Sequence, residues 1–264
     1  MRIRSLAFAG VLAGAHAAPL AAQGGGAGSM TGMNMDPTHK IVGSGTLPGD
    51  WMLRFDPARP AAPGRGGAAA PAMAAPTPAM TDVDVRTMGA NGIHFHSGPA
   101  AIYWSPRNVA TGEYSVSATF SQAKSMGHEA YGIFIGGTNL TDSTESYLYF
   151  EVKACRSSGP CTQPLTTGSN FGEVVISQRA GDGKAPVSLA SGHDSRVNAE
   201  NPATGAATNM LMIHVARDTV HFMLNDKLVR AIPKSLLAVP TDGLAGIRVN
   251  HNLDVHVESF TIKR

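Results

Sequence analysis

The sequence predicts an all-β protein of short antiparallel strands, arranged as a two-sheet sandwich or as a closed barrel. The main observation is that apolar and polar residues alternate through most of residues 81–264. A period of two places successive side chains on opposite faces of a strand, so that one face is buried and the other is not. Clusters of Gly, Asn, Asp and Pro separate the alternating runs and mark turns.

The clearest element is a β-hairpin within residues 209–224. Apolar residues recur at every second position on both sides of a polar turn. A short turn fixes the register, so we expect Ile213 to lie opposite Phe222 and His214 opposite His221. The first pair should then point into the core and the second pair away from it.

The other strands follow at intervals of ten to twenty residues. An early strand at 47–55 would place Trp51, Leu53 and Phe55 on one face. Residues 233–238 predict a single helical turn, and we expect no other helix. The remaining strands are expected at 82–88, 92–96, 100–104, 112–121, 130–136, 146–154, 172–179, 186–190, 227–231, 244–250 and 253–263.

The first residues have the features of an export signal. Arg2 and Arg4 precede a short apolar stretch, and small residues ending at Ala22 provide a cleavage site before Gln23. The sequence therefore predicts a signal peptide at 1–22 and a secreted or periplasmic protein.

One domain is expected from residue 47 to residue 264, after a disordered Gly- and Met-rich tail at 23–46. Residues 57–80 are almost wholly Ala, Pro and Gly, so they cannot form a packed element, and we interpret them as an insertion in this domain. The alternative is that everything before residue 81 is a tail, which would leave the apolar strand led by Trp51 exposed.

The composition excludes several classes of function. Only 15% of the 264 residues are charged, the net charge is +2, and the basic residues are scattered, so nothing favours nucleic acid as a partner. No later apolar stretch is long enough for a membrane span. Neither a phosphate-binding Gly loop nor a Gly-x-Ser-x-Gly elbow occurs, and we expect no bound cofactor.

The chain contains two cysteines, Cys155 and Cys161, close together in sequence. In an oxidising compartment the expected outcome is a disulfide between them. Free thiols or a metal site are the alternatives, although two thiols alone make a poor metal site.

Several Gly, aromatic and core positions resemble the concanavalin A-like jelly rolls. They are Trp51, the double strand from Gly92 to Trp104, the run Ala130–Gly136, and the closing run from Asn209 through Phe222, Asn225 and Gly243 to Gly246. Over roughly residues 47–264 the pattern is most similar to the 3-keto-disaccharide hydrolase domain family of secreted bacterial proteins. The resemblance implies two antiparallel sheets of about six strands each, one of them bent into a concave face, and sugar-related ligands.

The sequence departs from the laminarinase-type members of that superfamily. Those carry two Glu flanking an Asp on one face of one strand, at the spacing that a retaining glycosidase needs. No such string occurs here, and the nearest is Asp254, His256 and Glu258 on the final strand. We interpret these three residues as a polar outer face, and the resemblance transfers no catalytic residue.

Alternating aromatic residues give the strongest indication of a ligand site. Tyr147, Tyr149 and Glu151 alternate with apolar residues expected in the core, so they share the opposite face. Exposed aromatic rings on a concave sheet stack on the apolar faces of sugars, while carboxylates bind sugar hydroxyls. Trp104 could join this platform. The structural alternative is ordinary aromatic packing beneath a loop.

Histidines at every second position suggest further polar contacts. His94 and His96 share a strand face and could supply hydrogen bonds to a sugar, or two ligands to a metal. We favour a polar sheet face without a metal. The other residues considered as metal ligands are His128, His251 and His256, the hairpin face Met212, His214, His221 and Met223, and the tail residues Met30, Met33, Met35 and His39.

Three functions follow from these patterns. The first is a secreted carbohydrate-binding domain that uses Trp104, Tyr147, Tyr149, Glu151, His94 and His96. The second is a glycoside hydrolase or lyase acting on 3-keto-glycosides, which needs a general acid and a general base in one cleft. Its candidate catalytic residues are Glu151, His94, Asp254, His256 and Glu258. The third is a structural or adhesive domain of the envelope that binds no small ligand.

Overall fold

The computed structural model describes residues 44–57, 77–123, 129–155, 172–181 and 184–264, all within the unit formed by residues 33–264. In these ranges the chain forms fourteen β-strands and two single turns of 3-10 helix, with no α-helix. No helix in the described part of the chain is long and apolar enough to cross a membrane. The predicted all-β class is confirmed.

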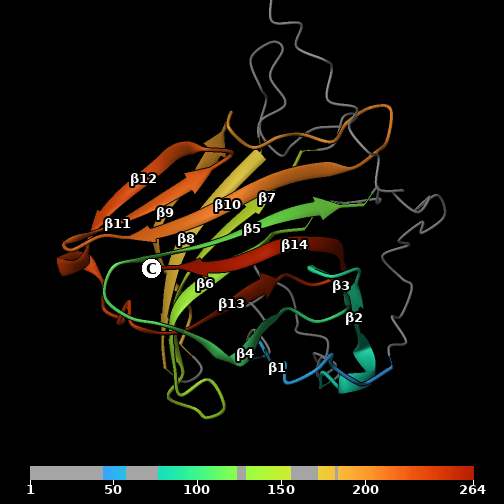
Figure 1. Ribbon diagram of the computed structural model, residues 1–264, viewed down its shortest axis with the longest axis horizontal. Helices are drawn as coiled ribbons and strands as arrows, with labels where there is room; N and C mark the ends of the chain where they lie inside the picture. Colours follow the sequence, from blue (N-terminus) through green and yellow to red (C-terminus); the bar gives the residue numbers. More distant parts are fainter. Residues whose placement is uncertain (1–43, 58–76, 124–128, 156–171, 182–183) are drawn as a thin grey trace, which may run out of the picture. The chain divides into compact units, whose positions relative to one another are not determined.

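The strands form two antiparallel sheets of seven strands each. The first sheet contains, in spatial order, β1 (Met52–Phe55), β4 (Ala101–Ala110), β13 (Gly243–Val249), β6 (Tyr131–Thr138), β7 (Ser146–Lys153), β8 (Gly172–Ala180) and β9 (Val187–Asp194). The second contains β12 (Lys227–Pro233), β11 (Thr219–Leu224), β10 (Ala207–Val215), β5 (Tyr114–Gln122), β14 (Leu253–Lys263), β3 (Gly92–Ser97) and β2 (Val83–Met88). Figure 1 shows the second sheet lying in front of the first. Each sheet ends in edge strands, so the fold is a sandwich and not a barrel.

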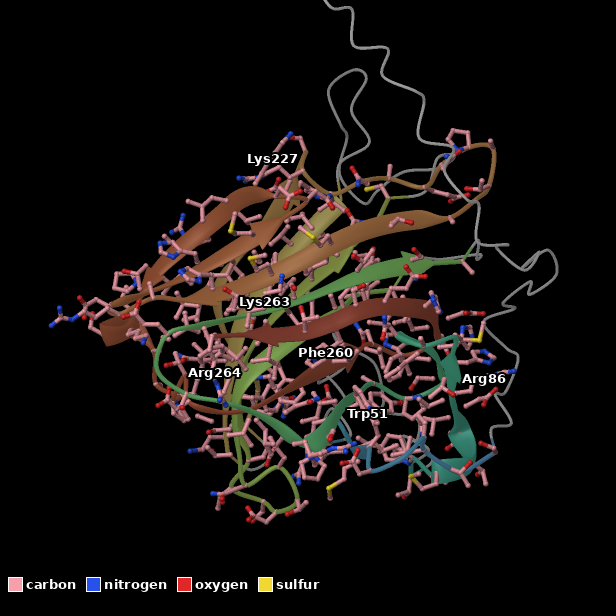
Figure 2. All side chains as sticks on the ribbon, viewed as in Figure 1. Trp51, Arg86, Lys227, Phe260, Lys263 and Arg264 are labelled. Atoms are coloured by element: carbon pink, nitrogen blue, oxygen red, sulfur yellow. The ribbon has the colours of Figure 1, made fainter. Side chains whose placement is uncertain are left out.

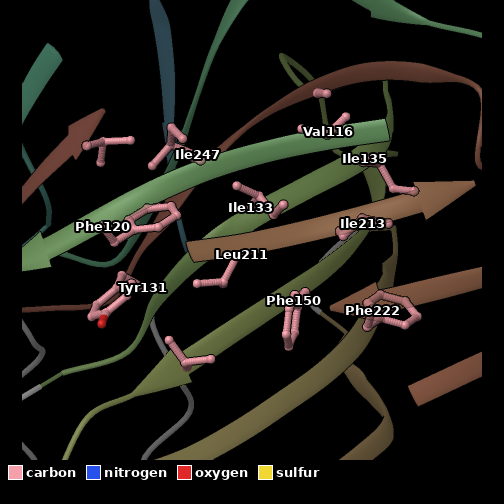
Figure 3. Packing of buried hydrophobic residues seen from close by; sticks show 14 of the residues in the cluster. Val116, Phe120, Tyr131, Ile133, Ile135, Phe150, Leu211, Ile213, Phe222 and Ile247 are labelled. Carbon is pink, nitrogen blue, oxygen red and sulfur yellow. The ribbon is translucent and has the colours of Figure 1, made fainter. Parts of the chain in front are cut away.

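The hydrophobic core lies between the two sheets, where the apolar side of each alternating strand faces its counterpart. Phe150 of β7 meets Phe222 of β11 edge-on, with ring centroids 5.7 Å apart, and Phe120 of β5 stacks on Tyr131 of β6 at 5.0 Å. Figure 3 shows these inward-facing residues close to one another. Removal of this apolar surface from water is the main favourable contribution to folding.

The predicted hairpin register is confirmed. Ile213 pairs with Phe222 and His214 pairs with His221 across β10 and β11. Ile213 and Phe222 are fully buried, whereas the two His are half-buried on the outer face. The His rings stack at 5.7 Å, and His214 Nδ1 lies 2.9 Å from the hydroxyl of Ser115.

Strand β4 is longer than predicted. The sequence suggested an end at Trp104, but the strand continues to Ala110. Its pairing with β13 shifts register after Trp104, and Pro106 lies within the shifted stretch. Proline cannot donate to the ladder, so it interrupts the pattern without ending the strand. The predicted helical turn is confirmed as η2 (Lys234–Leu236), but the expectation of no other helical turn is wrong, since η1 (Met80–Asp82) precedes β2.

Two of the positions that resemble jelly rolls have a local structural role. The Asn209 amide nitrogen donates to the buried Tyr131 hydroxyl at 2.9 Å and to the Asn198 carbonyl at 3.2 Å. The Asn225 amide nitrogen donates to the Asn209 side-chain oxygen at 2.9 Å, from a turn where Asn225 has a φ of 50°. These bonds fix the end of the hairpin against the first sheet.

The signal peptide, the Gly- and Met-rich tail and most of the 57–80 insertion lie outside the described residues. So does Cys161, whereas Cys155 is buried just after β7. The disulfide therefore stays a prediction.

Candidate functional site

The predicted site residues divide between the two outer faces of the sandwich. Trp104, Tyr147, Tyr149 and Glu151 lie on the outer face of the first sheet, because their strand neighbours fill the core. The other predicted residues, His94, His96, Asp254, His256 and Glu258, lie on the outer face of the second sheet. The core separates these groups, so the expectation that His94 and Glu151 share one cleft is wrong. Alternation gives the face of a residue within its own strand but not which sheet the strand joins.

The aromatic residues of the first sheet are buried. Tyr147, Tyr149 and Trp104 are 1%, 5% and 2% exposed, so the prediction of an open aromatic platform is wrong. The rings of Tyr147 and Tyr149 lie 5.8 Å apart, and Ile102 and Leu140 join them in a second apolar cluster outside the main core. The sequence placed these rings on the correct face but could not show what packs on them.

Two glycines make room for large side chains on this face. Arg248, Gly132 and Glu151 stand in one row across β13, β6 and β7. A Cβ on Gly132 would lie 1.9 Å from the Phe150 carbonyl oxygen, so only glycine fits here, and across it Arg248 Nε lies 3.1 Å from Glu151 Oε1. In the next row, a Cβ on Gly246 would lie 2.6 Å from the ring of Phe134, so the aromatic ring occupies that space.

Four charged residues form what we call the Arg248 cluster: Asp56, Glu151, Arg179 and Arg248. Arg248 binds Asp56 with both terminal nitrogens, at 2.9 and 2.7 Å. Arg179 lies 3.6 Å from the same carboxylate, and the Arg248 guanidinium sits 4.8 Å from the centre of the Tyr149 ring. Arg179, Glu151 and Arg248 are 5 to 6% exposed, so the cluster is almost entirely removed from water.

Sequence reasoning missed three of these four residues. Arg248 was detectable, since it is the single charged residue in the apolar strand 243–249. Asp56 and Arg179 carry no such signal, because their partner lies far away in the sequence.

The two carboxyl groups of the cluster have opposite pKa shifts. Burial raises the pKa of Glu151 above its usual value, more than the nearby Arg248 lowers it. Burial also acts to raise the pKa of Asp56, but the charges of Arg248 and Arg179 and the hydrogen bonds from Arg248 lower it below its usual value. Two carboxyl groups on one guanidinium are thus biased toward different protonation states.

Three buried atoms of the cluster have no hydrogen-bond partner in the described part of the chain. They are Glu151 Oε1, Arg179 Nε and Arg248 Nε. The Arg248 and Glu151 atoms are near each other but are not aligned for a hydrogen bond. Unsatisfied buried polar atoms are rare in native proteins and call for a ligand, water or functional explanation.

The outer face of the second sheet carries a histidine–carboxylate group. His94 stands opposite His256, and His94 Nε2 lies 3.4 Å from Asp254 Oδ1. His256 Nε2 lies 3.1 Å from Glu258 Oε1. His96, opposite Asp254 on the same face, is half-buried.

The metal alternative gains no support from this group. His251 contacts Glu129 at 3.8 Å, away from the His94 and His256 pair. Among the residues that the structure describes, no three His, Cys, Asp or Glu side chains are grouped so that they could hold a metal. His128 and the tail residues Met30, Met33, Met35 and His39 lie outside the described ranges.

Burial of His94 predicts a pH dependence of stability. Burial lowers its pKa more than Asp254 raises it, and Arg86, His96 and His256 lower it further. The unfolded chain then takes up the proton first, so stability should be lost as pH falls below about 6.5, the usual His value, toward the lower folded pKa. We expect His94→Gln to reduce the slope of melting temperature against pH between about pH 5 and 7. Equal slopes for His94→Gln and the unmodified chain would contradict this account.

Comparison with known proteins identifies the fold. No family model matches the sequence, and no curated protein matches it. A protein of unknown function with a galectin-like fold from Bacillus subtilis is 10% identical, with a TM-score of 0.50, covering 81% of this chain and 89% of the other. The carbohydrate-binding module CBM66 from Bacillus subtilis gives 12% identity and a TM-score of 0.47, over 65% and 86%. The Emp47p carbohydrate recognition domain gives 11% and 0.43, over 85% and 91%.

This chain therefore has a two-sheet sandwich with a galectin-like fold. At these identities the similarity concerns the fold alone. The function must be argued from the site.

Proposed function

We propose that this chain is a secreted carbohydrate-binding domain whose binding site is the Arg248 cluster with its aromatic floor. The observation that carries the proposal is a buried cluster of two guanidinium and two carboxyl groups beside Tyr149, in which Arg179 Nε has no hydrogen-bond partner in the described part of the chain. A cluster that served stability alone would gain little, because desolvation of buried ion pairs offsets most of their attraction.

The chemistry of the cluster suits a sugar. Guanidinium groups donate, and carboxylates accept, the hydrogen bonds that neighbouring sugar hydroxyls need. The side chain of Asp56 is 21% exposed, so a ligand would reach Arg248 from the Asp56 side.

Calorimetric titration tests this function. A glycan array with the purified full chain would first select a sugar, and titration would then measure its affinity. We expect Glu151→Gln to weaken binding by about tenfold, because an amide replaces the carboxyl group that would bind a sugar hydroxyl. Glu173→Gln, on the exposed face of neighbouring β8, should bind as the unmodified chain does. Absence of saturable binding at millimolar sugar would contradict the proposal.

A second candidate function is cleavage of 3-keto-glycosides, as a glycoside hydrolase or as a lyase. The opposite pKa shifts of Glu151 and Asp56 favour it, because a protonated and an ionised carboxyl group are the acid and base that such a reaction needs. Glu151 would act as the general acid and Asp56 as the general base. Turnover of a 3-keto-glucoside, lost in Glu151→Gln while the substrate still binds, would establish the enzyme.

The envelope-domain hypothesis has no specific observation in its favour. It would gain support if neither the array nor the turnover assay gave a signal.

A further inference from the structure

A groove with polar and aromatic walls lies beside Trp51, away from the Arg248 cluster. It runs between β4 of the first sheet and β14 of the second and has a volume of about 580 Å³, within the roughly 300–1,000 Å³ range of small-molecule sites. A second hollow of about 450 Å³ continues it past Phe260 toward Arg264. Figure 2 shows Trp51, Phe260 and Arg264 labelled along this side of the molecule.

Two strand irregularities contribute to this groove. The pairing of β13 with β4 shifts register after Trp104. Strand β14 bulges between Glu258 and Thr261, where Ser259 has a φ of 55°. A left-handed conformation is uncommon for a residue other than glycine, and bulges are frequent next to functional sites.

The charged residues of the groove neutralise each other. Arg107 binds Asp50 through Nε at 2.8 Å and Nη2 at 3.0 Å. The Ser105 hydroxyl donates to the same carboxylate at 3.0 Å. Burial raises the pKa of Asp50, but the hydrogen bonds from Ser105 and Arg107 outweigh it and lower the pKa, so the carboxylate is ionised. Arg107 keeps three N–H donors that Asp50 does not use.

Two amide side chains in the groove are free to bind a ligand. Asn91, from the turn between β2 and β3, and Asn108, on β4, both line the groove. Within the described part of the chain neither side-chain amide has a hydrogen-bond partner. Trp51 also lines the groove, and its two aromatic neighbours, Phe95 and Phe260, both meet it at 68°, so neither stacks parallel on the indole.

We propose that this groove is a second saccharide-binding site, specific for a neutral oligosaccharide. Amide, hydroxyl and guanidinium groups beside an indole match a ligand with many hydroxyls and apolar ring faces. The Asp50–Arg107 pair leaves no excess charge for an anion at this point. The continuation past Phe260 accommodates more than one sugar ring. The groove is proposed to bind the same class of ligand as the Arg248 cluster, but it contains none of the residues of that cluster. Each site can therefore be tested independently of the other.

The two tryptophans of the chain report on the two sites separately, since Trp51 lines the groove and Trp104 lies in the aromatic floor of the first sheet. Trp104→Phe leaves Trp51 as the only indole emitter, and Trp51→Phe leaves Trp104. Each variant of the full chain would be titrated with cellotetraose, laminaritetraose and maltotetraose up to about 10 mM. We expect a saturable change in Trp51 emission with at least one of these sugars.

Substitutions in the groove supply the decisive comparison. In the Trp104→Phe background, Asn91→Ala with Asn108→Ala should raise the Kd by about tenfold or more, and Arg107→Ala should do the same. Arg230→Ala, on the exposed edge strand β12, is the matched control and should leave the Kd unchanged.

Two results would overturn the groove proposal: no change in Trp51 emission with any of the three sugars, or an unaltered Kd in the asparagine variant. A response from Trp104 alone would overturn the groove proposal and support the Arg248 cluster. A response from Trp51 alone would support the groove proposal and would contradict binding of these sugars at the Arg248 cluster.

Discussion

Phe222→Ala should lower the free energy of unfolding by about 3–5 kcal/mol, which urea denaturation would measure. Phe222 is fully buried and packs edge-on against Phe150 of the opposite sheet. Its truncation removes apolar contact area and leaves a cavity between the sheets that close-packed neighbours fill only in part.

His221→Ala is the control, because His221 precedes Phe222 on the same strand and points to the other face. Its loss should be far smaller, within about 1 kcal/mol, since a half-buried surface side chain leaves no core cavity. Equal losses at the two positions would mean that the strand faces are assigned the wrong way round.

Arg248→Met should lower the free energy of unfolding by about 3–5 kcal/mol at neutral pH, because it leaves Asp56 and Glu151 without their shared cation. Methionine keeps most of the length of the side chain, so the cost reports on charge more than on volume. Glu151→Gln should cost less, since it removes a carboxyl group that burial already biases toward the neutral form.

The pH dependence separates this electrostatic cost from a packing defect. In the unmodified chain the lowered pKa of Asp56 contributes stability at pH values above its usual value of 3.8, and this is lost as pH falls through the folded pKa. Without Arg248 that contribution shrinks to what Arg179 and Arg54 supply. In the same variant the pKa of Glu151, already raised by burial, rises further. Ionisation of Glu151 then destabilises the folded chain at pH values above 4.5.

The Glu151 effect makes the stability difference between Arg248→Met and the unmodified chain shrink as the solution is acidified from pH 7 toward pH 4.5. The Asp56 effect shrinks it further below about pH 3.8. Urea denaturation at several pH values measures it. A difference that stays constant with pH would show that Arg248 acts through packing alone.

Much of the fold could be predicted from the sequence because it depends on local alternation. Leu148 and Phe150 face the core, and Tyr147, Tyr149 and Glu151 face the other way, as period two requires. The hairpin pairs followed from the same rule with a short turn. The extension of β4 past Pro106 could not be predicted, since it depends on where β13 shifts its pairing.

The site was less predictable because long-range contacts determine it. Asp56 and Arg248 are 192 residues apart in the sequence, and nothing local to Asp56 indicates that they bind each other. The burial of Tyr147 depends on side chains such as Leu140 from another segment. Whether His94 and Glu151 share a face is decided by which sheet each strand joins, and alternation carries no information on that.

The central claim is that the Arg248 cluster binds sugar, and a crystal structure of the full chain with the sugar selected by calorimetry tests it most directly. We expect sugar hydroxyls within hydrogen-bond distance of Arg248 and Asp56, on the side where Asp56 is exposed. A sugar bound only elsewhere, for example only in the groove beside Trp51, would contradict the claim.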